Sequence, residues 1–562
     1  MKTSGSILSG SGGTGGKAAG LEVIENRLKE LRSDVELPMD VSVPEYSVIP
    51  TEFFTDFVQR NHLEHLAEDD TPDDRIGMAF MDGEMSPRLT GSLWKYISEM
   101  HEPVAVRSSS LLEDSLESPL AGIYQTKMIP NNQPSPQSRF TKLMEAIKLV
   151  WASTYFQDAV DFHRGLNIPT SSEAMAVILQ MIAGRRYGSR FYPMVSGVAR
   201  SLNYYAFGKS EPEDGVVNLA LGLGKTIVDG APCWTYSPAR PGTPPPFGSI
   251  GEMMRETQNS FWAVNMGRVT DYDPIRETEY MFSCTLEDAD YDDTLKYTAS
   301  TYIPGSDRLV SGTGRKGPRV LDFAPILKDN IMPLNETLLK LMDCFSGGGE
   351  TPVEIEFALR GPGRQKEPAS LCLLQLRETA AMDSEVSIDD EDRNEERLVL
   401  QSRKALGNCR TEFEYAVYVK PESFSASRTS AIAGEIAAVN RELRKKDIGY
   451  ILIGYGRWGS SDPWLGIPVK WGQISGAGAI VELTGTGMRV ELSQGSHFFH
   501  NLSSFGIGYL CVSEALDGGI AWDLLNRGSE TVSESEHVKC VRIHSGLTVK
   551  IDGKQGLGVV VR

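Results

Sequence analysis

Four polar side chains alternate with apolar residues along two predicted strands. Glu354 and Glu356 lie two residues apart in the first strand, and Gln375 and Arg377 lie two residues apart in the second. Because successive side chains of a strand point to opposite faces, each pair shares one face. If the strands pair, a carboxylate, an amide oxygen and a guanidinium converge. Carboxylate and amide oxygens are suitable ligands for Mg²⁺. Solvated charges on two edge strands are the alternative.

An arginine and two serines follow the short apolar strand predicted at 103–106. Arg107 ends this strand, and Ser108 and Ser109 come directly after it. A guanidinium binds oxyanions through two parallel hydrogen bonds, and neighbouring hydroxyls add further donors. The segment is therefore a candidate phosphate clamp, with a surface turn as the alternative.

The N-terminal run GSGGTGGK at 10–17 precedes a predicted helix. It does not match a P-loop, because Ser11 and Ala18 stand where a P-loop needs Gly and Ser or Thr. It does not match a dinucleotide-binding fingerprint either, because that motif needs a solid strand before it and only Ser6–Ser9 is available. Glycines nevertheless expose backbone N–H groups at a helix N-terminus, and Lys17 adds a positive charge for phosphate. A flexible tail is the alternative.

Two segments near the C-terminus carry further candidates. Residues 454–468 read GYGRWGSSDPWLGIP, which surrounds an arginine with hydroxyls and aromatic rings and suits an anionic or ring-bearing ligand. A turn packed by Gly and Trp is the alternative. Residues 494–500 read QGSHFFH, in which His497 is either a nucleophile for a phosphoryl group or a buried core histidine. The other candidate ligand residues here are Arg457, Ser460, Ser461, Asp462 and His500.

Predicted helices and predicted strands alternate along the chain, and these elements must position the candidate groups. Apolar residues recur at three- and four-residue spacing in the predicted helices, and the predicted strands are short apolar or alternating runs. An acidic stretch at 383–397 is nearly free of apolar residues, which is typical of a linker. We therefore expect an α/β (α+β) protein with an N-terminal domain (1–380), a linker (381–398) and a smaller C-terminal α/β domain (399–562). The predicted helices lie at about 18–32, 51–67, 90–101 and 138–164, and the predicted strands at 175–182, 194–199, 216–221, 353–359, 371–375, 450–453 and 479–483.

The composition excludes several classes of protein. The chain of 562 residues carries 56 Lys and Arg against 75 Asp and Glu, a net charge of −19, which argues against nucleic acid as the main partner. Its 7 cysteines are scattered without a CxxC pair, so a disulfide framework or zinc ribbon is not expected. The N-terminus lacks the apolar core of a signal peptide, and no run reaches the roughly 18 apolar residues of a membrane span. We expect a cytoplasmic protein without a membrane partner.

A series of segments, taken in order, resembles the N-terminal domain of the phosphoenolpyruvate synthase and pyruvate phosphate dikinase family. They are GGKAAGL, VRSS with ED and AGIY, WASTYFQDAVDFHR, MAVILQMI, SGVA, GLGKTIVDG, VEIEFA and LLQLR. The resemblance spans about 10–378 and implies an ATP-grasp module that binds ATP and Mg²⁺. The family usually has Glu after Gly-Leu-Gly, where this chain has Lys225, and the inverted charge implies altered contacts to the nucleotide.

The resemblance implies a role for each matching residue. Glu356 and Gln375 would bind Mg²⁺, and Arg377 and Arg107 would be catalytic, since both would stabilise charge on the transferring phosphoryl group. Arg164 resembles an arginine at the end of a family helix. The ATP-binding residues implied are Lys17, Arg107, Ser108, Ser109, Gln180, Met181, Lys225, Glu356, Gln375 and Arg377.

The chain departs from the full enzymes of the family beyond residue 400. Roughly 160 residues follow, too few for the family's (β/α)₈ pyruvate-binding barrel. The Thr-Ser/Cys-His-Ala phosphohistidine signature of the swivelling domain is also absent. The C-terminal region instead resembles the tail of bacterial phosphoenolpyruvate-synthase-like proteins. A swivelling-domain-like arrangement with His497 as the phosphoryl acceptor is one alternative for this region.

We expect an Mg²⁺- and ATP-dependent phosphotransferase, similar to pyruvate, water dikinases, that transfers a phosphoryl group to His497 or to an unidentified acceptor. A separate protein would then supply the missing pyruvate site. The alternative is a nucleotide-binding regulatory or partner subunit without turnover. Lys225 and the missing barrel favour the subunit, whereas Glu356, Gln375 and Arg377 favour the enzyme.

Overall fold

The structure is a computed structural model of the whole chain. Contacts between residues divide the chain into two compact units. The first unit comprises 1–160, 169–228 and 232–379, and the second comprises 161–168, 229–231 and 380–562. The structure describes all residues except 1–5, 8–9, 11, 35, 68–70, 112, 114–121, 166–167, 204–207, 244, 246, 270, 364–366, 379–385, 461–464, 485–500, 503–504 and 554.

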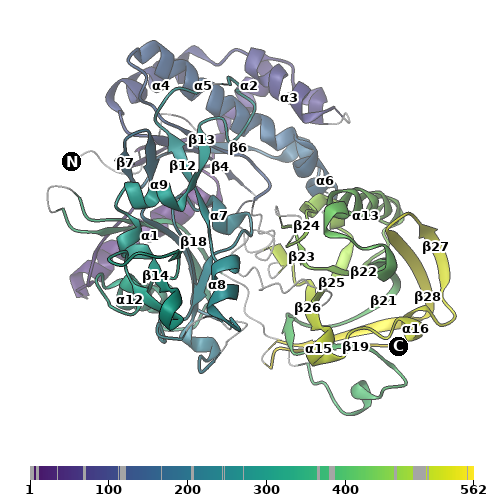
Figure 1. The fold of residues 1–562 in the computed structure, drawn as a ribbon. Coiled ribbons are helices and arrows are strands. Elements are labelled where there is room, and N and C mark those ends of the chain that lie inside the picture. The colour runs from purple at the N-terminus through teal and green to yellow at the C-terminus, as the bar shows by residue number, and fades with distance from the viewer. Residues whose placement is uncertain are drawn as a thin grey trace. The chain divides into compact units, whose positions relative to one another are not determined.

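The first unit contains a five-stranded sheet whose central strands are antiparallel, in the order β1-β3-β6-β4-β5. Its central strand β6 is apolar at nearly every position, because both of its faces are covered. Helices α2 (Thr51–Arg60), α4 (Pro87–Glu99) and α5 (Pro136–Ala152) gather beside this sheet (Figure 1). The strands are β1 (Ser6–Ile7), β3 (Tyr46–Ile49), β6 (Met175–Met181), β4 (Val104–Ser110) and β5 (Thr126–Ile129).

A six-stranded sheet of the first unit has the order β11-β10-β9-β17-β18-β2. Strands β17 and β18 pair antiparallel, so that Glu354 lies opposite Arg377 and Glu356 opposite Gln375. A bulge after Glu356 leaves Leu374 as the extra residue of β18. The strands are β11 (Trp234–Tyr236), β10 (Val216–Ala220), β9 (Val195–Arg200), β17 (Val353–Arg360), β18 (Ser370–Glu378) and β2 (Asp40–Ser42).

Helix α1 (Gly16–Asp34) joins the two sheets through one apolar core. Its buried residues Leu21, Ile24 and Leu28 recur at three- and four-residue spacing and pack into a cluster that includes Ile178 of β6 and Phe357 of β17. The unit also holds a four-stranded and a three-stranded sheet. Their strands are β7 (Arg185–Tyr187), β8 (Arg190–Tyr192), β12 (Ser260–Asn265) and β13 (Met281–Thr285), and β14 (Ser300–Ile303), β15 (Arg308–Ser311) and β16 (Arg319–Val320).

The remaining helices of the first unit are shorter or flank these sheets. They are α3 (Asp73–Asp82), α6 (Gln157–Gly165, whose last turn clusters with the second unit), α7 (Lys225–Val228), α8 (Ile250–Glu256), α9 (Leu286–Tyr291), α10 (Leu295–Thr298), α11 (Ala324–Leu327) and α12 (Leu334–Phe345).

The second unit is built on a nine-stranded sheet with a parallel centre. Strands β21, β22, β25 and β26 run parallel to one another, while β28 and β29 add antiparallel strands beside β21. Helix α13 (Thr429–Arg444) connects β21 to β22 and buries Ile432 and Ile436. The sheet strands are β19 (Leu398–Ser402), β20 (Lys404–Leu406), β21 (Asn408–Val419), β22 (Tyr450–Tyr455), β25 (Ala477–Thr484), β26 (Gly508–Ser513), β27 (Glu530–Glu534), β28 (Val538–Asp552) and β29 (Leu557–Val561).

Two short strands and two short helices also belong to the described part of the second unit. Strands β23 (Arg457–Trp458) and β24 (Gly466–Ile467) form a parallel pair of their own. Helices α15 (Glu514–Asp517) and α16 (Trp522–Asn526) follow β26. Within the stretch predicted to be a linker, the carboxylate of Asp392 is buried and lies 2.6 Å from the Lys550 ammonium.

The predicted α+β class is confirmed, and the part of the chain that the structure describes contains no (β/α)₈ barrel. The single helix predicted at 138–164 is wrong in detail, because the chain turns at Ser153–Tyr155 and separates α5 from α6. The hydroxyl of Ser153 accepts a hydrogen bond from the backbone N–H of Gln125, which ties this break to the start of β5.

Candidate functional site

The guanidinium of Arg107 connects the two sheets of the first unit. It donates to the side-chain oxygen of Gln180 on β6 (3.0 Å) and to that of Gln375 on β18 (2.9 Å). It also donates to the carbonyl oxygen of Leu374, the extra residue of the β18 bulge, at 2.9 Å. The carboxylate of Glu356 lies 3.9 Å away. The bulge thus supplies an acceptor that holds Arg107 against β18.

Gln180 is left with an unused donor. Its side-chain oxygen accepts from Arg107, which fixes the orientation of the amide. Its side-chain nitrogen Nε2 is then buried and has no hydrogen-bond partner among the described residues. A buried N–H without a partner is costly, so this nitrogen indicates a place for an acceptor atom of a ligand. Met181, the next residue, ends β6 and is half-buried.

Arg377 and Glu354 form a buried ion-pair network behind this site. The Arg377 guanidinium lies 3.0 Å from the carboxylate of Glu354 and 3.2 Å from that of Glu356. Glu354 is 3% exposed and also pairs with Arg200 of β9 at 2.6 Å. The sequence pattern placed Glu354 on the same strand face as Glu356. It did not reveal Arg200, because Arg200 and Glu354 are 154 positions apart in the chain.

Lys17 lies at the start of α1, beside the end of β4. Its ammonium donates to the hydroxyl of Ser108 (3.0 Å) and pairs with the carboxylate of Glu113 (2.6 Å), with all three groups buried. Ser109 accepts from the backbone N–H of Ala18 at 3.1 Å. These contacts need glycine, because a Cβ at Gly15 would lie 1.9 Å from the carbonyl oxygen of Ser109.

The predicted phosphate ligands therefore fall into two groups. Arg107 and Ser108 are neighbours on β4, so their side chains point to opposite faces of the strand. Arg107 contacts β6 and β18, whereas Ser108 contacts Lys17 and Glu113. The structure brings Arg107, Gln180, Glu356, Gln375 and Arg377 together, and it holds Lys17 in a separate ion pair.

Glu113 belongs to a buried polar network that sequence reasoning missed. Its carboxylate accepts from the backbone N–H of Ser110 (2.9 Å). The Ser110 hydroxyl donates to Glu173 (3.0 Å), which also accepts from the Tyr124 hydroxyl (2.8 Å). Burial and the two nearby carboxylates raise the pKa of Tyr124 well above its usual value, so Tyr124 is a hydrogen-bond donor here.

Two other predicted residues lie away from this cluster. Lys225 begins α7, and its ammonium lies 3.4 Å from the carboxylate of Glu277, a pairing that the sequence did not reveal. Arg164 is exposed, pairs with Asp161 at 3.0 Å and clusters with the second unit.

The donor set at the meeting point of β17 and β18 fits Mg²⁺. Glu356 offers a half-buried carboxylate and Gln375 an amide oxygen, and the two residues are paired directly across the strands. Hard oxygen donors of this kind, completed by phosphate oxygens and water, are the usual environment of Mg²⁺. Arg377 and Arg107 lie beside these oxygens and offset their negative charge.

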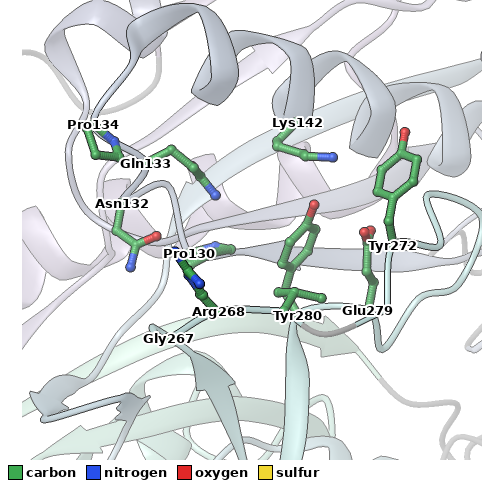
Figure 2. Close-up of a pocket in the computed structure, with 11 residues that line it drawn as sticks. Pro130, Asn132, Gln133, Pro134, Lys142, Gly267, Arg268, Tyr272, Glu279 and Tyr280 are labelled. Atoms are coloured by element: carbon green, nitrogen blue, oxygen red, sulfur yellow. The ribbon is translucent and has the colours of Figure 1, made fainter.

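A pocket of about 420 Å³ lies at the edge of the five-stranded sheet, beside the start of α5. Figure 2 shows Lys142, Tyr272, Glu279 and Tyr280 among its lining residues. Glu279 pairs with Lys127 of β5 at 2.6 Å. In register, Thr126 lies opposite Arg107, so the next residue, Lys127, points to the other face of the sheet. The pocket is therefore separate from the Arg107 cluster.

The C-terminal candidates are described only in part. Arg457 lies on β23, and its guanidinium donates to the carbonyl oxygen of Gly230, a residue of the same compact unit, at 3.1 Å. Ser460 is buried. The predicted residues Ser461, Asp462, His497 and His500 lie outside the described residues.

A buried glutamate supports the turn around Arg457. Glu482 of β25 accepts from the backbone N–H of Trp458 (2.9 Å) and from the hydroxyl of Tyr509 on β26. Burial raises the pKa of this carboxyl to about 7, although Tyr509, Trp458 and the Arg457 charge oppose the shift. The contact of Glu482 with Tyr509 depends on the pairing of β25 with β26, so the local sequence did not indicate a role for Glu482.

Fold and site together define an α+β domain in which arginines, carboxylates and glutamine side chains gather where two sheets meet. Residues 12–397 match the family model described as the pyruvate phosphate dikinase AMP/ATP-binding domain. This match covers more than half of the chain, so the protein belongs to that family, as its sequence motifs predicted.

A distant relative is the uncharacterized phosphotransferase YvkC of Bacillus subtilis (strain 168). The two chains are 27% identical over 188 residues, which is 34% of this chain and 20% of the relative. The alignment therefore spans only a fifth of that protein. No helix among the described residues has the length and apolar character needed to cross a membrane.

Proposed function

We propose that this protein is an Mg²⁺- and ATP-dependent phosphotransferase whose nucleotide site lies in the first unit. The observation that supports it best is the convergence of Arg107, Gln180, Glu356, Gln375 and Arg377 from four strands. Membership of an AMP/ATP-binding family supports the nucleotide. The similarity to a protein named as a phosphotransferase supports the reaction class.

In this proposal the two arginines stabilise the transferring phosphoryl group. Arg107 presents its guanidinium between Gln180 and Gln375, and Arg377 is held rigid by Glu354, so neither side chain needs to reorganise during transfer. Positioning and preorganised charge account for most of the catalysis of phosphoryl transfer. The unused N–H of Gln180 would bind an acceptor atom of the nucleotide. Lys17 would bind a phosphate oxygen after leaving Glu113.

Glu356 and Gln375 would hold Mg²⁺. The ion, when bound, neutralises phosphate charge and aligns the transferred group. We propose that the acceptor is His497 or a molecule bound near Arg457 and Ser460, and that product analysis distinguishes a kinase from a dikinase. A separate protein would supply any pyruvate site.

A nucleotide-binding subunit without turnover is the second candidate. The ion pair between Lys225 and Glu277 favours it, because the family usually has a carboxylate at position 225. Here that position carries an ammonium, which pairs with Glu277. Such a protein would bind ATP and leave it intact.

The test is incubation of the full chain with Mg²⁺ and ATP labelled at the β- or γ-phosphate, comparing the native protein with Arg377→Ala and His497→Ala. We expect label on the protein or on a product, and at least a 100-fold loss of transfer in Arg377→Ala with only a modest loss of ATP binding. Arg185→Ala, which removes an arginine outside the cluster, is the matched control. Acid-labile label that is present on the native chain and on Arg185→Ala but absent from His497→Ala would identify a phosphohistidine at this position.

ATP that binds to the native chain and is never consumed would favour the subunit instead. Equal losses of binding and transfer in Arg377→Ala would show that Arg377 acts in binding rather than in the transition state.

A further inference from the structure

A histidine and two glutamates converge in the second unit, away from every residue assigned above. Glu435 extends from α13, whereas Glu536 and His537 lie in the turn between β27 and β28. One ligand atom of each residue lies within 4.8 Å of the other two. The three side chains thus come from two elements that are about 100 positions apart in the chain.

The hydrogen bond at the other ring nitrogen fixes the tautomer of His537. Nδ1 lies 3.0 Å from the carbonyl oxygen of Ser423, and a carbonyl oxygen can only accept, so Nδ1 carries a proton. The second nitrogen, Nε2, then faces a carboxylate oxygen of Glu536 at 3.7 Å. In a neutral imidazole, two lone pairs would oppose each other there. A metal ion, a proton or a bridging water between the two atoms relieves this repulsion.

The charge of the cluster favours a divalent ion over a proton. Among the described residues, neither Glu435 nor Glu536 forms an ion pair with a lysine or arginine. The nearby Lys420 and Lys539 instead pair with Glu534, at 3.2 and 3.4 Å. Two carboxylates therefore remain without a basic partner, and one added proton would neutralise only half of their charge.

The surroundings are arranged as they are at many metal sites. The His537 side chain is only 6% exposed, and a backbone carbonyl orients its ring, as is common for imidazole ligands of metals. One carboxylate oxygen of Glu435 accepts from the backbone N–H groups of His537 (2.9 Å) and Val538 (3.1 Å) and from the Ser535 hydroxyl. Among the described residues, its other oxygen accepts no hydrogen bond, which leaves it available as a ligand.

We propose that Glu435, Glu536 and His537 form a binding site for a divalent transition-metal ion. One imidazole nitrogen with two carboxylates suits Zn²⁺ or Mn²⁺ rather than Mg²⁺, which strongly prefers all-oxygen sites. Three protein ligands leave at least one position for water. The bound ion ties α13 to the turn between β27 and β28. This site does not depend on the proposed phosphotransferase function.

The test uses the full chain, freed of metals by dialysis against a chelator. Zn²⁺ alone, and separately Mn²⁺ alone, are titrated by calorimetry, and the unfolding temperature is measured with and without each ion. We expect about one equivalent of Zn²⁺ to bind and to raise the unfolding temperature. Glu536→Gln is the main variant, because the Glu536 side chain is exposed and pairs with His537. We expect it to weaken Zn²⁺ binding by about 10- to 100-fold.

Two further variants sharpen the result. His537→Gln should abolish the thermal shift, even if this buried substitution lowers the basal stability. His544→Gln is the matched control, because His544 also lies 3.7 Å from a glutamate, Glu530, but is exposed and belongs to no group of three potential ligands among the described residues. It should bind Zn²⁺ as the native chain does.

Three outcomes would overturn the proposal. One is Zn²⁺ binding of equal strength in the native chain, Glu536→Gln and His537→Gln, which would place the metal elsewhere, for example on a cysteine. Another is a loss of Zn²⁺ binding in His544→Gln as large as the loss in Glu536→Gln and His537→Gln. The last is no saturable binding of either ion together with an NMR signal for a proton on Nε2 of His537, which would assign the positive charge to an imidazolium.

Discussion

At the scale of single residues, the cations of the proposed nucleotide site already have internal partners. Arg107 is bound by two glutamines and a carbonyl oxygen, Arg377 by two carboxylates, and Lys17 by Glu113 and Ser108. Lys17 differs from the arginines because its ion pair is held on the opposite face of β4. A phosphate would have to compete with Glu113 for its ammonium.

Glu113→Gln is expected to tighten the binding of ATP and to destabilise the free protein. Removing one partner of a buried ion pair leaves the other charge unpaired, which costs about 3 kcal/mol, and a phosphate would then compensate Lys17. The unfolding temperature without ATP should fall, and the rise caused by ATP should exceed that of the native chain. Differential scanning fluorimetry with and without Mg²⁺-ATP measures both quantities.

Glu173→Gln is a suitable control, since this buried carboxylate hydrogen-bonds Ser110 and Tyr124. It should lower stability without strengthening the response to ATP. Weaker ATP binding in Glu113→Gln would mean that Glu113 positions Lys17 for the nucleotide rather than competing with it.

At the scale of elements, one strand of the second unit controls a neighbouring turn. Glu482 lies on β25 and binds the backbone of Trp458 on β23 and the hydroxyl of Tyr509 on β26. The charged group that faces it is Arg457 of β23, and the nearby thiol of Cys511 on β26 is neutral because burial raises its pKa. The protonation state of one carboxyl thus acts on three strands.

Glu482 should make the second unit less stable as the pH rises. Its pKa is raised from 4.5 to about 7 in the folded chain, so between these values the folded state holds a proton that the unfolded state releases. The free energy of unfolding therefore falls across this window, by on the order of 3 kcal/mol in total. This stabilising contribution is complete below pH 4.5 and lost above pH 7.

The variant Glu482→Gln should remove this dependence, because a neutral amide can accept from the Trp458 N–H through its oxygen and donate to the Tyr509 hydroxyl through its nitrogen. Urea unfolding at pH 5 and pH 8 gives the free energy of unfolding of the variant and of the native chain. The contributions of the other titrating groups cancel in the difference between the two free energies. Glu412→Gln, an exposed change on β21, is the control. A pH-independent difference for Glu482→Gln would show that this carboxyl is ionised in the folded state throughout the range.

At the scale of the whole molecule, the chain divides into two compact units with separate cores. All residues of the Arg107 cluster and of the Lys17 ion pair belong to the first unit, and the proposed metal site belongs to the second. Ligands of the two sites should therefore protect different parts of the chain.

Hydrogen exchange with a non-hydrolysable ATP analogue and Mg²⁺ tests this separation. We expect slower exchange in β4, β17 and β18, whose residues would contact the nucleotide, and unchanged exchange in β21 and β28. Zn²⁺ should give the opposite pattern, with slower exchange in α13 and at the start of β28. Protection of both units by the analogue alone would mean that nucleotide binding involves the second unit as well.

The sequence alone determined those features that depend on neighbouring residues. Alternation along two strands predicted that Glu354 and Glu356 share one face and that Gln375 and Arg377 share another, and the register of β17 and β18 places these pairs opposite each other. Short ordered motifs were sufficient to predict the family, because they preserve residue types at local spacings.

Tertiary structure decided which distant groups meet. The ion pairs of Lys17 with Glu113 and of Arg200 with Glu354, and the cluster around His537, join residues about 100 or more positions apart. Sheet order and strand register create these contacts, and a local sequence pattern predicts neither of them. The bulge at Leu374 is a further example, since its carbonyl becomes a ligand of Arg107 only when the two sheets are packed together.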